Sequence, residues 1–107
     1  MLRQQETRAH PEWATEESVN LLRKNNYFLE DEDSRTMYLR VVNHLSNYLP
    51  DSMDKDLIAD KWFKYIWNNW LCPSTPVLCN VGTDRGLSIS CFGNRSSDTM
   101  NDIYEKI

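Results

Sequence analysis

A change of pattern after Trp70 is the feature that most constrains the fold of this chain. Before it, the sequence holds no glycine and only two prolines, so helices can run for several turns. Residues 71–94, LCPSTPVLCNVGTDRGLSISCFGN, then bring two more prolines, all three glycines and all three cysteines. Pro73 and Pro76 are expected to prevent a regular helix through CPSTPV, and Gly82 and Gly86 supply turns. The sequence therefore predicts a helical first part and a second part of turns and extended chain.

Two helices are predicted first. Thr15 is a capping residue followed by acids suited to a helix N-terminus, and this helix ends near Asn25–Asn26, with Val19 and Leu22 facing inward. The next helix begins at Ser34 as its cap and ends at Pro50. Its apolar residues fall at i, i+3, i+4, i+7, i+10 and i+11, the clearest helical face in the chain: Tyr38, Val41, Val42, Leu45, Tyr48 and Leu49.

A third helix is predicted from about Asp54 to Trp70. One face carries Ile58, Trp62, Tyr65, Ile66 and Asn69, and Trp67 and Trp70 widen the apolar surface. Three tryptophans within nine residues could form a ligand platform, but packing in a core or an interface is the favoured interpretation.

The segments around these helices are polar. Residues 1–12, MLRQQETRAHPE, carry no apolar period, so a flexible N-terminal arm is expected. The acidic run in YFLEDED, residues 27–33, is interpreted as a solvated loop.

Near the end of the chain, side chains that would lie on opposite faces of a strand alternate along the sequence. In LSISCF, residues 87–92, Leu87, Ile89 and Cys91 share one face. Ser96 or Ser97 is predicted to cap a last helix that carries Met100, Ile103 and Ile107 on its apolar side. A single strand leaves its backbone groups unpaired on both edges, so this set of elements does not complete a fold.

Composition narrows the class of protein. A chain of 107 residues forms one domain at most, and its net charge of -4 argues against nucleic-acid binding. It still permits a nucleotide ligand, since hydroxyls and backbone N–H groups can hold a phosphate. No signal peptide or membrane span is apparent, and three cysteines without a compact framework fit a reducing compartment. A cytoplasmic protein without membrane contact is expected.

The cysteines are separated by six and eleven residues, which matches no compact zinc pattern, so no metal site is predicted. A site that also used His44 stays conceivable. Cys72 and Cys79 are interpreted as small buried apolar residues. Cys91 differs because it follows Ser90 on the predicted strand, just before a Gly–Asn turn, where a thiol can be held in a fixed position against a substrate.

The sequence resembles a known family. CPSTPVLCNVGTDRGLSISCFGN resembles the start of the catalytic barrel in the large subunit of ribonucleotide reductase, in the class I form without an N-terminal ATP-cone. The upstream PEWATEESVNLLRKNNYFLEDEDSRTMYLRVV resembles the helical region that precedes that barrel, so the resemblance runs from about Pro11 to Ile107. The combination of PSTPV, GTDRGL and SCF is specific. Ser88 departs from the pattern, since proline stands there in many relatives.

The resemblance implies roles for five residues. Thr75 and Ser90 would bind the substrate diphosphate through their hydroxyls. Cys91 would be one of the two thiols that reduce the ribose and close to a disulfide. Asp98, followed by Thr99, would contact the effector nucleotide that tunes substrate choice. For Asp98, stabilisation of a helix N-terminus remains the structural alternative.

The resemblance also implies what this chain lacks: the radical-bearing cysteine and the second cysteine of the redox pair. The expected fold is mainly α, with an arm (1–12), a helical region (13–70) and the first strand and helix stub of a ten-stranded α/β barrel (71–107) that a complementary chain completes. A split gene, a split-intein product or an artificial truncation would each produce such a fragment. No cofactor is expected on this chain. The radical would come from a metal-containing small subunit and the reducing equivalents from a thioredoxin- or glutaredoxin-type protein.

Two other classes of function stay open. One is a non-catalytic helical interaction module derived from that family, although a pure binding role would not need Thr75, Ser90, Cys91 and Asp98 together. The other is a small metal or redox protein that uses its three cysteines.

Overall fold

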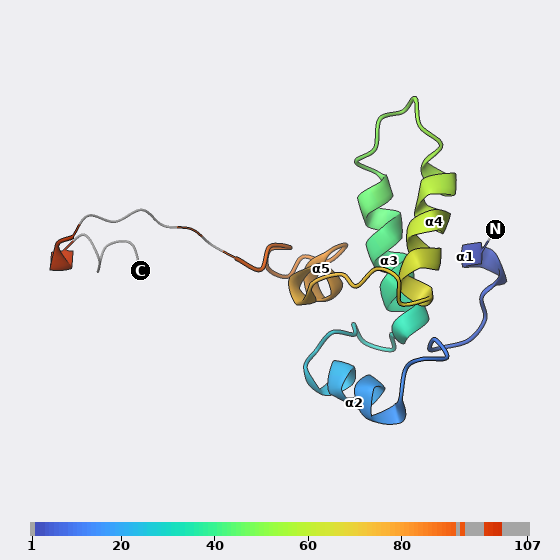
Figure 1. The fold of residues 1–107 in the computed structure, drawn as a ribbon, viewed down its shortest axis with the longest axis horizontal. Coiled ribbons are helices and arrows are strands. Elements are labelled where there is room, and N and C mark those ends of the chain that lie inside the picture. Colours follow the sequence, from blue (N-terminus) through green and yellow to red (C-terminus); the bar gives the residue numbers. More distant parts are fainter. Residues whose placement is uncertain (1, 92, 94–97, 102–107) are drawn as a thin grey trace.

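The computed structural model describes residues 2–91, 93 and 98–101, and within them it is helical with no β-strand (Figure 1). The helices of this part of the chain are α1 (Leu2–Gln5), α2 (Glu16–Lys24), α3 (Ser34–Ser46), α4 (Lys55–Trp67) and α5 (Thr75–Asn80). α3 and α4 lie side by side as an antiparallel pair, with α1 against α4 and α5 against α3. The mainly helical class that the sequence predicts is therefore confirmed for the described residues. No described helix has the length and apolarity needed to span a membrane.

The core lies between α3 and α4. Met37, Val41 and Phe63 are almost completely buried, and Phe63 stacks on Trp67 with their ring centroids 5.3 Å apart. Tyr38 meets the same indole edge-on at 6.2 Å. Aromatic pairs of this kind add to the stabilisation that burial alone gives. The helical period that the sequence shows through Val41 and Val42 is thus the period of the observed core.

Capping residues start each long helix. Thr15 caps α2, as predicted, in a reciprocal pair with Ser18. α3 differs from the prediction because Asp33, and not Ser34, is its cap: the Asp33 carboxylate accepts from the Thr36 N–H at 2.8 Å. Ser34 becomes the first helical residue, is buried, and its hydroxyl lies 2.7 Å from His10 Nδ1. Asp54 caps α4 through a single hydrogen bond, which its carboxylate accepts from the Leu57 N–H at 3.1 Å.

Two helices end earlier than predicted. α3 stops at Ser46, with Asn47 as its C-cap, so Tyr48 lies beyond the helix and is exposed. α4 stops at Trp67 because Asn69 has a φ of 61°, a left-handed conformation that terminates helices. Trp70 is consequently 68% exposed, while Trp67 is in the core. Packing in the core is therefore confirmed for Trp67, whereas Trp70 lies outside the core, and its packing in an interface stays a prediction.

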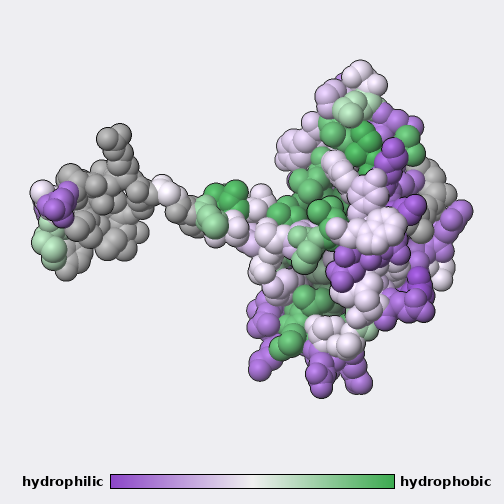
Figure 2. Space-filling view, viewed as in Figure 1, coloured by the Kyte–Doolittle hydropathy of each residue, from purple (hydrophilic) through white to green (hydrophobic). Residues whose placement is uncertain are grey.

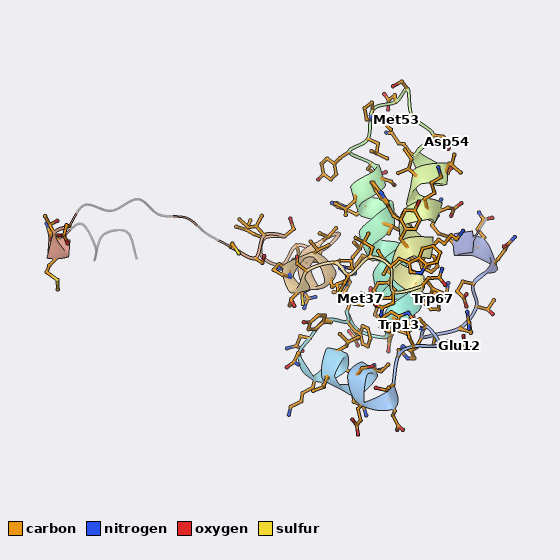
Figure 3. The ribbon with its side chains drawn as sticks, in the orientation of Figure 1. Glu12, Trp13, Met37, Met53, Asp54 and Trp67 are labelled. Carbon is orange, nitrogen blue, oxygen red and sulfur yellow. The ribbon has the colours of Figure 1, made fainter. Side chains whose placement is uncertain are left out.

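The N-terminal segment departs from the flexible arm that its polar sequence predicts. Arg3 pairs with Asp56 and Asp60 of α4, and these carboxylates raise its pKa although burial works against the charge. Further along, the Trp13 indole donates to the Trp67 carbonyl at 2.6 Å, where this segment crosses the end of α4 (Figure 3). The segment is attached by ion pairs and single hydrogen bonds, and such contacts leave no apolar period in a sequence.

The acidic loop before α3 is only partly solvated, which corrects a second expectation. Glu30 and Asp31 are exposed, but the Glu32 side chain is 8% exposed and forms an ion pair with Arg40. Phe28 from the same loop is buried. Apolar and acidic side chains of this loop therefore both pack into the folded structure.

The chain leaves this helical body after the turn that follows α5 (Figure 1). Residues 87–91 do not form the predicted strand, and no other strand exists among the described residues to pair with them. Phe92, Ser96, Ser97, Ile103 and Ile107, on which the rest of the strand and the last helix depend, lie outside the described residues.

Candidate functional site

Helix α5 carries the first of the predicted site residues. No helix runs through the whole of CPSTPV, as expected, but one begins within it: Pro73 precedes the helix and Pro76 lies in the first turn. A first-turn residue has no helical acceptor for its N–H, so proline costs nothing there. Ser74 is the N-cap residue and Thr75 opens the helix. The sequence thus places Thr75 at the end of a rigid element.

The Thr75 side chain lies at the surface and contacts the loop between α2 and α3. Its hydroxyl oxygen is 2.7 Å from that of Tyr27. Tyr27 is itself fixed at both backbone groups, since its N–H donates to the Leu22 carbonyl at 3.0 Å and its carbonyl accepts from Arg40 at 3.3 Å. Thr75 therefore presents a hydroxyl whose position depends on a tertiary contact.

Arg40 of α3 joins three segments through one guanidinium group. Nε and Nη2 donate to the two carboxylate oxygens of Glu32, each at 3.0 Å. Nη1 and Nη2 also donate to the carbonyls of Val81 and Leu78, at 2.5 and 2.8 Å, at the end of α5. Both charged side chains are more than nine-tenths buried, so the pair is largely shielded from water. Arg40 consequently fixes α5 and the Tyr27 loop to the same point of α3.

Arg85 makes a second attachment at the same end of α5. Its guanidinium donates to the carbonyls of Cys79 and Asn26, the latter at 3.0 Å. The turn that carries it is closed by Thr83, whose hydroxyl donates to the Asn80 carbonyl at 2.7 Å and accepts from the Arg85 N–H at 3.0 Å. Cations are favourable at a helix C-terminus, where carbonyls remain unpaired. This role explains the GTDRG stretch, residues 82–86, as a structural clamp on α5.

Gly82 completes the clamp. Its φ is +75°, and an added Cβ would lie 2.9 Å from Arg40 Cγ. Glycine is needed here both for its backbone conformation and for the close approach of the arginine stem.

Ser90 and Cys91 lie on the segment that leaves the helical body. Both are exposed, their side-chain oxygen and sulfur are 3.8 Å apart, and Cys91 is a free thiol. No hydrogen bond among the described residues joins either of them to Thr75. Asp98 and Thr99, the predicted effector residues, are also exposed and follow residues 94–97, which are outside the description. The structure therefore does not bring the predicted site residues together.

The other two cysteines differ from each other. Cys79 is partly buried, but Cys72 is exposed, so the prediction of a buried Cys72 is wrong. Cys72 follows the left-handed turn at Asn69, which directs the chain away from the end of α4. Its neighbour Tyr38 is buried, and this burial, with a contribution from Cys72, raises the pKa of Tyr38 to about 12. Within the described residues, no group of three or more His, Cys, Asp or Glu side chains could hold a metal ion.

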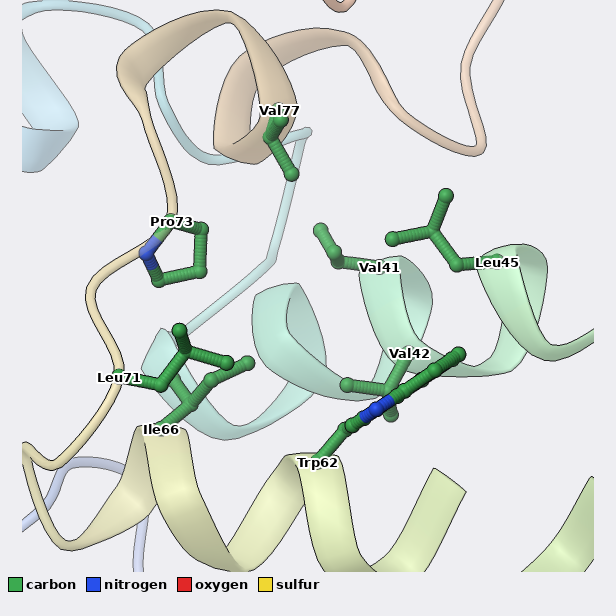
Figure 4. A pocket seen from close by; sticks show the side chains of 8 residues that line it. All are labelled: Val41, Val42, Leu45, Trp62, Ile66, Leu71, Pro73 and Val77. Carbon is green, nitrogen blue, oxygen red and sulfur yellow. The ribbon is translucent and has the colours of Figure 1, made fainter. Parts of the chain in front are cut away.

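An apolar cavity of about 180 Å³ lies between α3, α4 and the segment that leads into α5 (Figure 4). It is lined by Val41, Val42, Leu45, Trp62, Ile66, Leu71, Pro73 and Val77. None of these side chains is charged, and the Trp62 indole N–H is their single polar group, so the lining does not favour a phosphate.

Sequence reasoning missed Arg40, Arg85 and Tyr27. Arg40 sits between apolar positions of α3 and shows no signal of its own. Arg85 lies in a turn between two glycines, a position that gives no sign of the hydrogen bonds that fix its side chain.

The structure defines a protein with a small all-helical domain. A segment that carries hydroxyl and thiol side chains follows this domain. The family model described as ribonucleotide reductase, all-alpha domain, matches residues 13–86, which is more than half of the chain. The chain belongs to the ribonucleotide reductase family. Comparison with curated proteins and with solved structures finds no match. The family is one of oxidoreductases that act in deoxyribonucleotide biosynthesis.

Proposed function

We propose that this chain contributes substrate-phosphate contacts and one redox cysteine to a class I ribonucleoside-diphosphate reductase without an ATP-cone. It would act in the cytoplasm, after assembly with a complementary chain that carries the rest of the catalytic barrel. The observation that supports this most strongly is the Thr75 hydroxyl, held at the surface by the clamped helix α5 in a chain of the reductase family.

Thr75 and Ser90 are the proposed ligands of the substrate diphosphate. A hydroxyl donates to phosphate oxygens without adding charge to the site. In the free chain Ser90 is not joined to Thr75. On assembly, residues 87–91 would pair with strands of the complementary chain, and this pairing would fix Ser90 and Cys91 relative to α5.

Exposed apolar side chains support this assembly. Leu87 and Ile89 are 62% and 52% exposed on the segment that leaves the body, where Figure 2 shows apolar surface. Met100 is 66% exposed further on. Apolar surface of this kind typically belongs to an interface.

Cys91 is proposed to act as one half of a dithiol. When the ribose 2′-hydroxyl leaves as water, Cys91 and a second thiol on the complementary chain together supply two electrons and two protons, a C–H bond replaces the C–O bond, and the thiols join as a disulfide. A thioredoxin- or glutaredoxin-type protein would then reduce the disulfide. The radical that starts the reaction would come from a metal-containing small subunit.

Asp98 and Thr99 are proposed to contact the effector nucleotide. Both lie in the exposed segment beyond residue 97, and a carboxylate there can accept hydrogen bonds from the sugar or base of a nucleotide.

Reconstitution tests the proposal. The chain alone is expected to reduce no ribonucleotide, and mixing it with the complementary chain and the small subunit should restore reduction. Turnover by the chain alone would contradict the fragment model. Stable binding to the complementary chain without any gain of reduction would favour the interaction module.

A further inference from the structure

We propose that Tyr27 is a positioning residue that directs the Thr75 hydroxyl toward the substrate diphosphate. This inference rests on the proposed function. Its basis is the 2.7 Å contact between the two hydroxyl oxygens, which join residues 48 positions apart in the sequence. That separation is in the middle of the normal range for an O–H···O hydrogen bond.

The direction of this hydrogen bond decides what Thr75 can do. Each hydroxyl has one proton, and the phenol is the more acidic of the two, hence the better donor. When Tyr27 donates to Thr75 Oγ1, the threonine proton is free to point toward a third group. Phosphate oxygens only accept hydrogen bonds, so a free donor is what a diphosphate requires. Consecutive hydrogen bonds also polarise each other, which strengthens the outer one.

Arg40 holds both of the segments that carry Tyr27 and Thr75. The guanidinium donates to the Tyr27 carbonyl at 3.3 Å and to the Leu78 carbonyl of α5 at 2.8 Å. The Tyr27 ring also packs against the core as a partly buried residue. Tyr27 and Thr75 therefore keep a constant separation, and the rotation of the Thr75 hydroxyl is restricted before any substrate arrives.

The contact contributes little to holding α5 in place. At the opposite end of the helix, Arg40 donates to the carbonyls of Leu78 and Val81. Arg85, in the turn that follows, donates to the carbonyls of Cys79 in α5 and of Asn26 in the loop after α2. The pair of hydroxyls is exposed by comparison. Removal of the phenol oxygen should therefore alter substrate binding while leaving the fold in place.

The test uses the assembled reductase, with Tyr27→Phe, Thr75→Val and the double variant, and Tyr48→Phe as the matched control at an exposed tyrosine. KM and kcat are measured with a ribonucleoside diphosphate, and inorganic pyrophosphate serves as a competing probe of the phosphate site. Tyr27→Phe is expected to raise KM and the pyrophosphate inhibition constant by about three- to tenfold, the value of one hydrogen bond, with kcat nearly unchanged. In the Thr75→Val background it should add nothing.

The outcomes separate this inference from the proposed function. If Thr75→Val leaves KM unchanged, the phosphate contact itself is wrong, and the inference fails with it. If Thr75→Val raises KM but Tyr27→Phe does not, only the inference is wrong. Equal effects of Tyr27→Phe in both backgrounds would also overturn it.

A second variant covers the case in which Tyr27→Phe lowers the melting temperature. Fluorotyrosine at position 27 keeps the ring and the hydrogen bond and makes the phenol a stronger donor. In the assembled reductase it should lower KM for the diphosphate. An unchanged or higher KM would overturn the inference.

Discussion

Two parts of the helical body are held together in opposite ways. α3 and α4 share an apolar interface in which Phe63 and Met37 are fully buried. α5 and its turn are instead fixed by two guanidinium groups on backbone carbonyls. Apolar contacts are non-directional, whereas a planar guanidinium requires its acceptors at defined angles. The helix that carries the proposed phosphate ligand is thus held in a defined position by directional bonds.

The apolar interface should be the most sensitive to loss of volume. Phe63→Ala removes a ring that stacks on Trp67 and leaves a cavity in a region without solvent access. A loss of about 3–5 kcal/mol in the free energy of unfolding is expected, measured by urea titration with tryptophan fluorescence. Tyr65→Ala on the exposed side of α4 is the control. A loss below about 1 kcal/mol for Phe63→Ala would mean that the two helices do not share this core.

The attachment of α5 through Arg40 should weaken when one charge of the Arg40–Glu32 pair is lost. Arg40→Met leaves the Glu32 carboxylate buried without its partner, and about 3 kcal/mol of stability should be lost. Adding Glu32→Gln should recover part of this loss, because no unpaired charge then remains. Lys24→Met, at an exposed position of α2, is the matched control. Equal stability of Arg40→Met and the parent would show that Arg40 does not hold α5 against α3.

Asp98 lies outside both parts, so its substitution should affect ligand binding and not the fold. If Asp98 accepts hydrogen bonds from an effector, Asp98→Ala removes a charged acceptor worth about 1.5–3 kcal/mol. Effector affinity in the assembled enzyme should fall about tenfold to a hundredfold, and the ratio of two competing substrates should stop responding to effector. Unchanged affinity with a lower melting temperature would assign Asp98 to helix stabilisation.

Gly82 tests the fine fit of the clamp and should give the smallest effect. Gly82→Ala forces an alanine into a φ of +75° and a Cβ to 2.9 Å from Arg40 Cγ, at a cost of about 1–2 kcal/mol. Gly93→Ala is the control, because an added Cβ there meets no heavy atom within 4 Å. Equal melting temperatures for the two variants would mean that Arg40 does not pack against Gly82.

The same contrast explains which features could be predicted. The α3 face through Tyr38, Val41 and Val42 follows from the helical period, because burial of an apolar face leaves that period in the sequence. The Arg40 and Arg85 contacts could not be predicted, since they join segments up to 59 residues apart through backbone carbonyls that every residue carries. Helix ends were misplaced for a local reason: one left-handed Asn69 stops α4, and asparagine signals this only weakly.

The roles of the candidate site residues stay predictions. The stretch that holds Thr75, Ser90 and Cys91 could be selected from its hydroxyls, cysteines and turn residues, and from its resemblance to a family. The alternation of side chains in residues 87–91 could not by itself establish a strand, because a strand forms only when a neighbouring strand pairs with its backbone groups. Tyr27 was missed because its contact with Thr75 depends on the tertiary position of a loop.

Sustained turnover by Cys91→Ser in the assembled enzyme tests the proposed role of this chain most directly. Each reduction oxidises two thiols, and a serine hydroxyl cannot form the disulfide, so the variant should show no multiple turnover. Cys72→Ser and Cys79→Ser should retain it, with effects on stability at most. Reduction by Cys91→Ser at the parental steady rate, with loss of turnover in Cys79→Ser, would contradict the assignment of Cys91 as the redox cysteine.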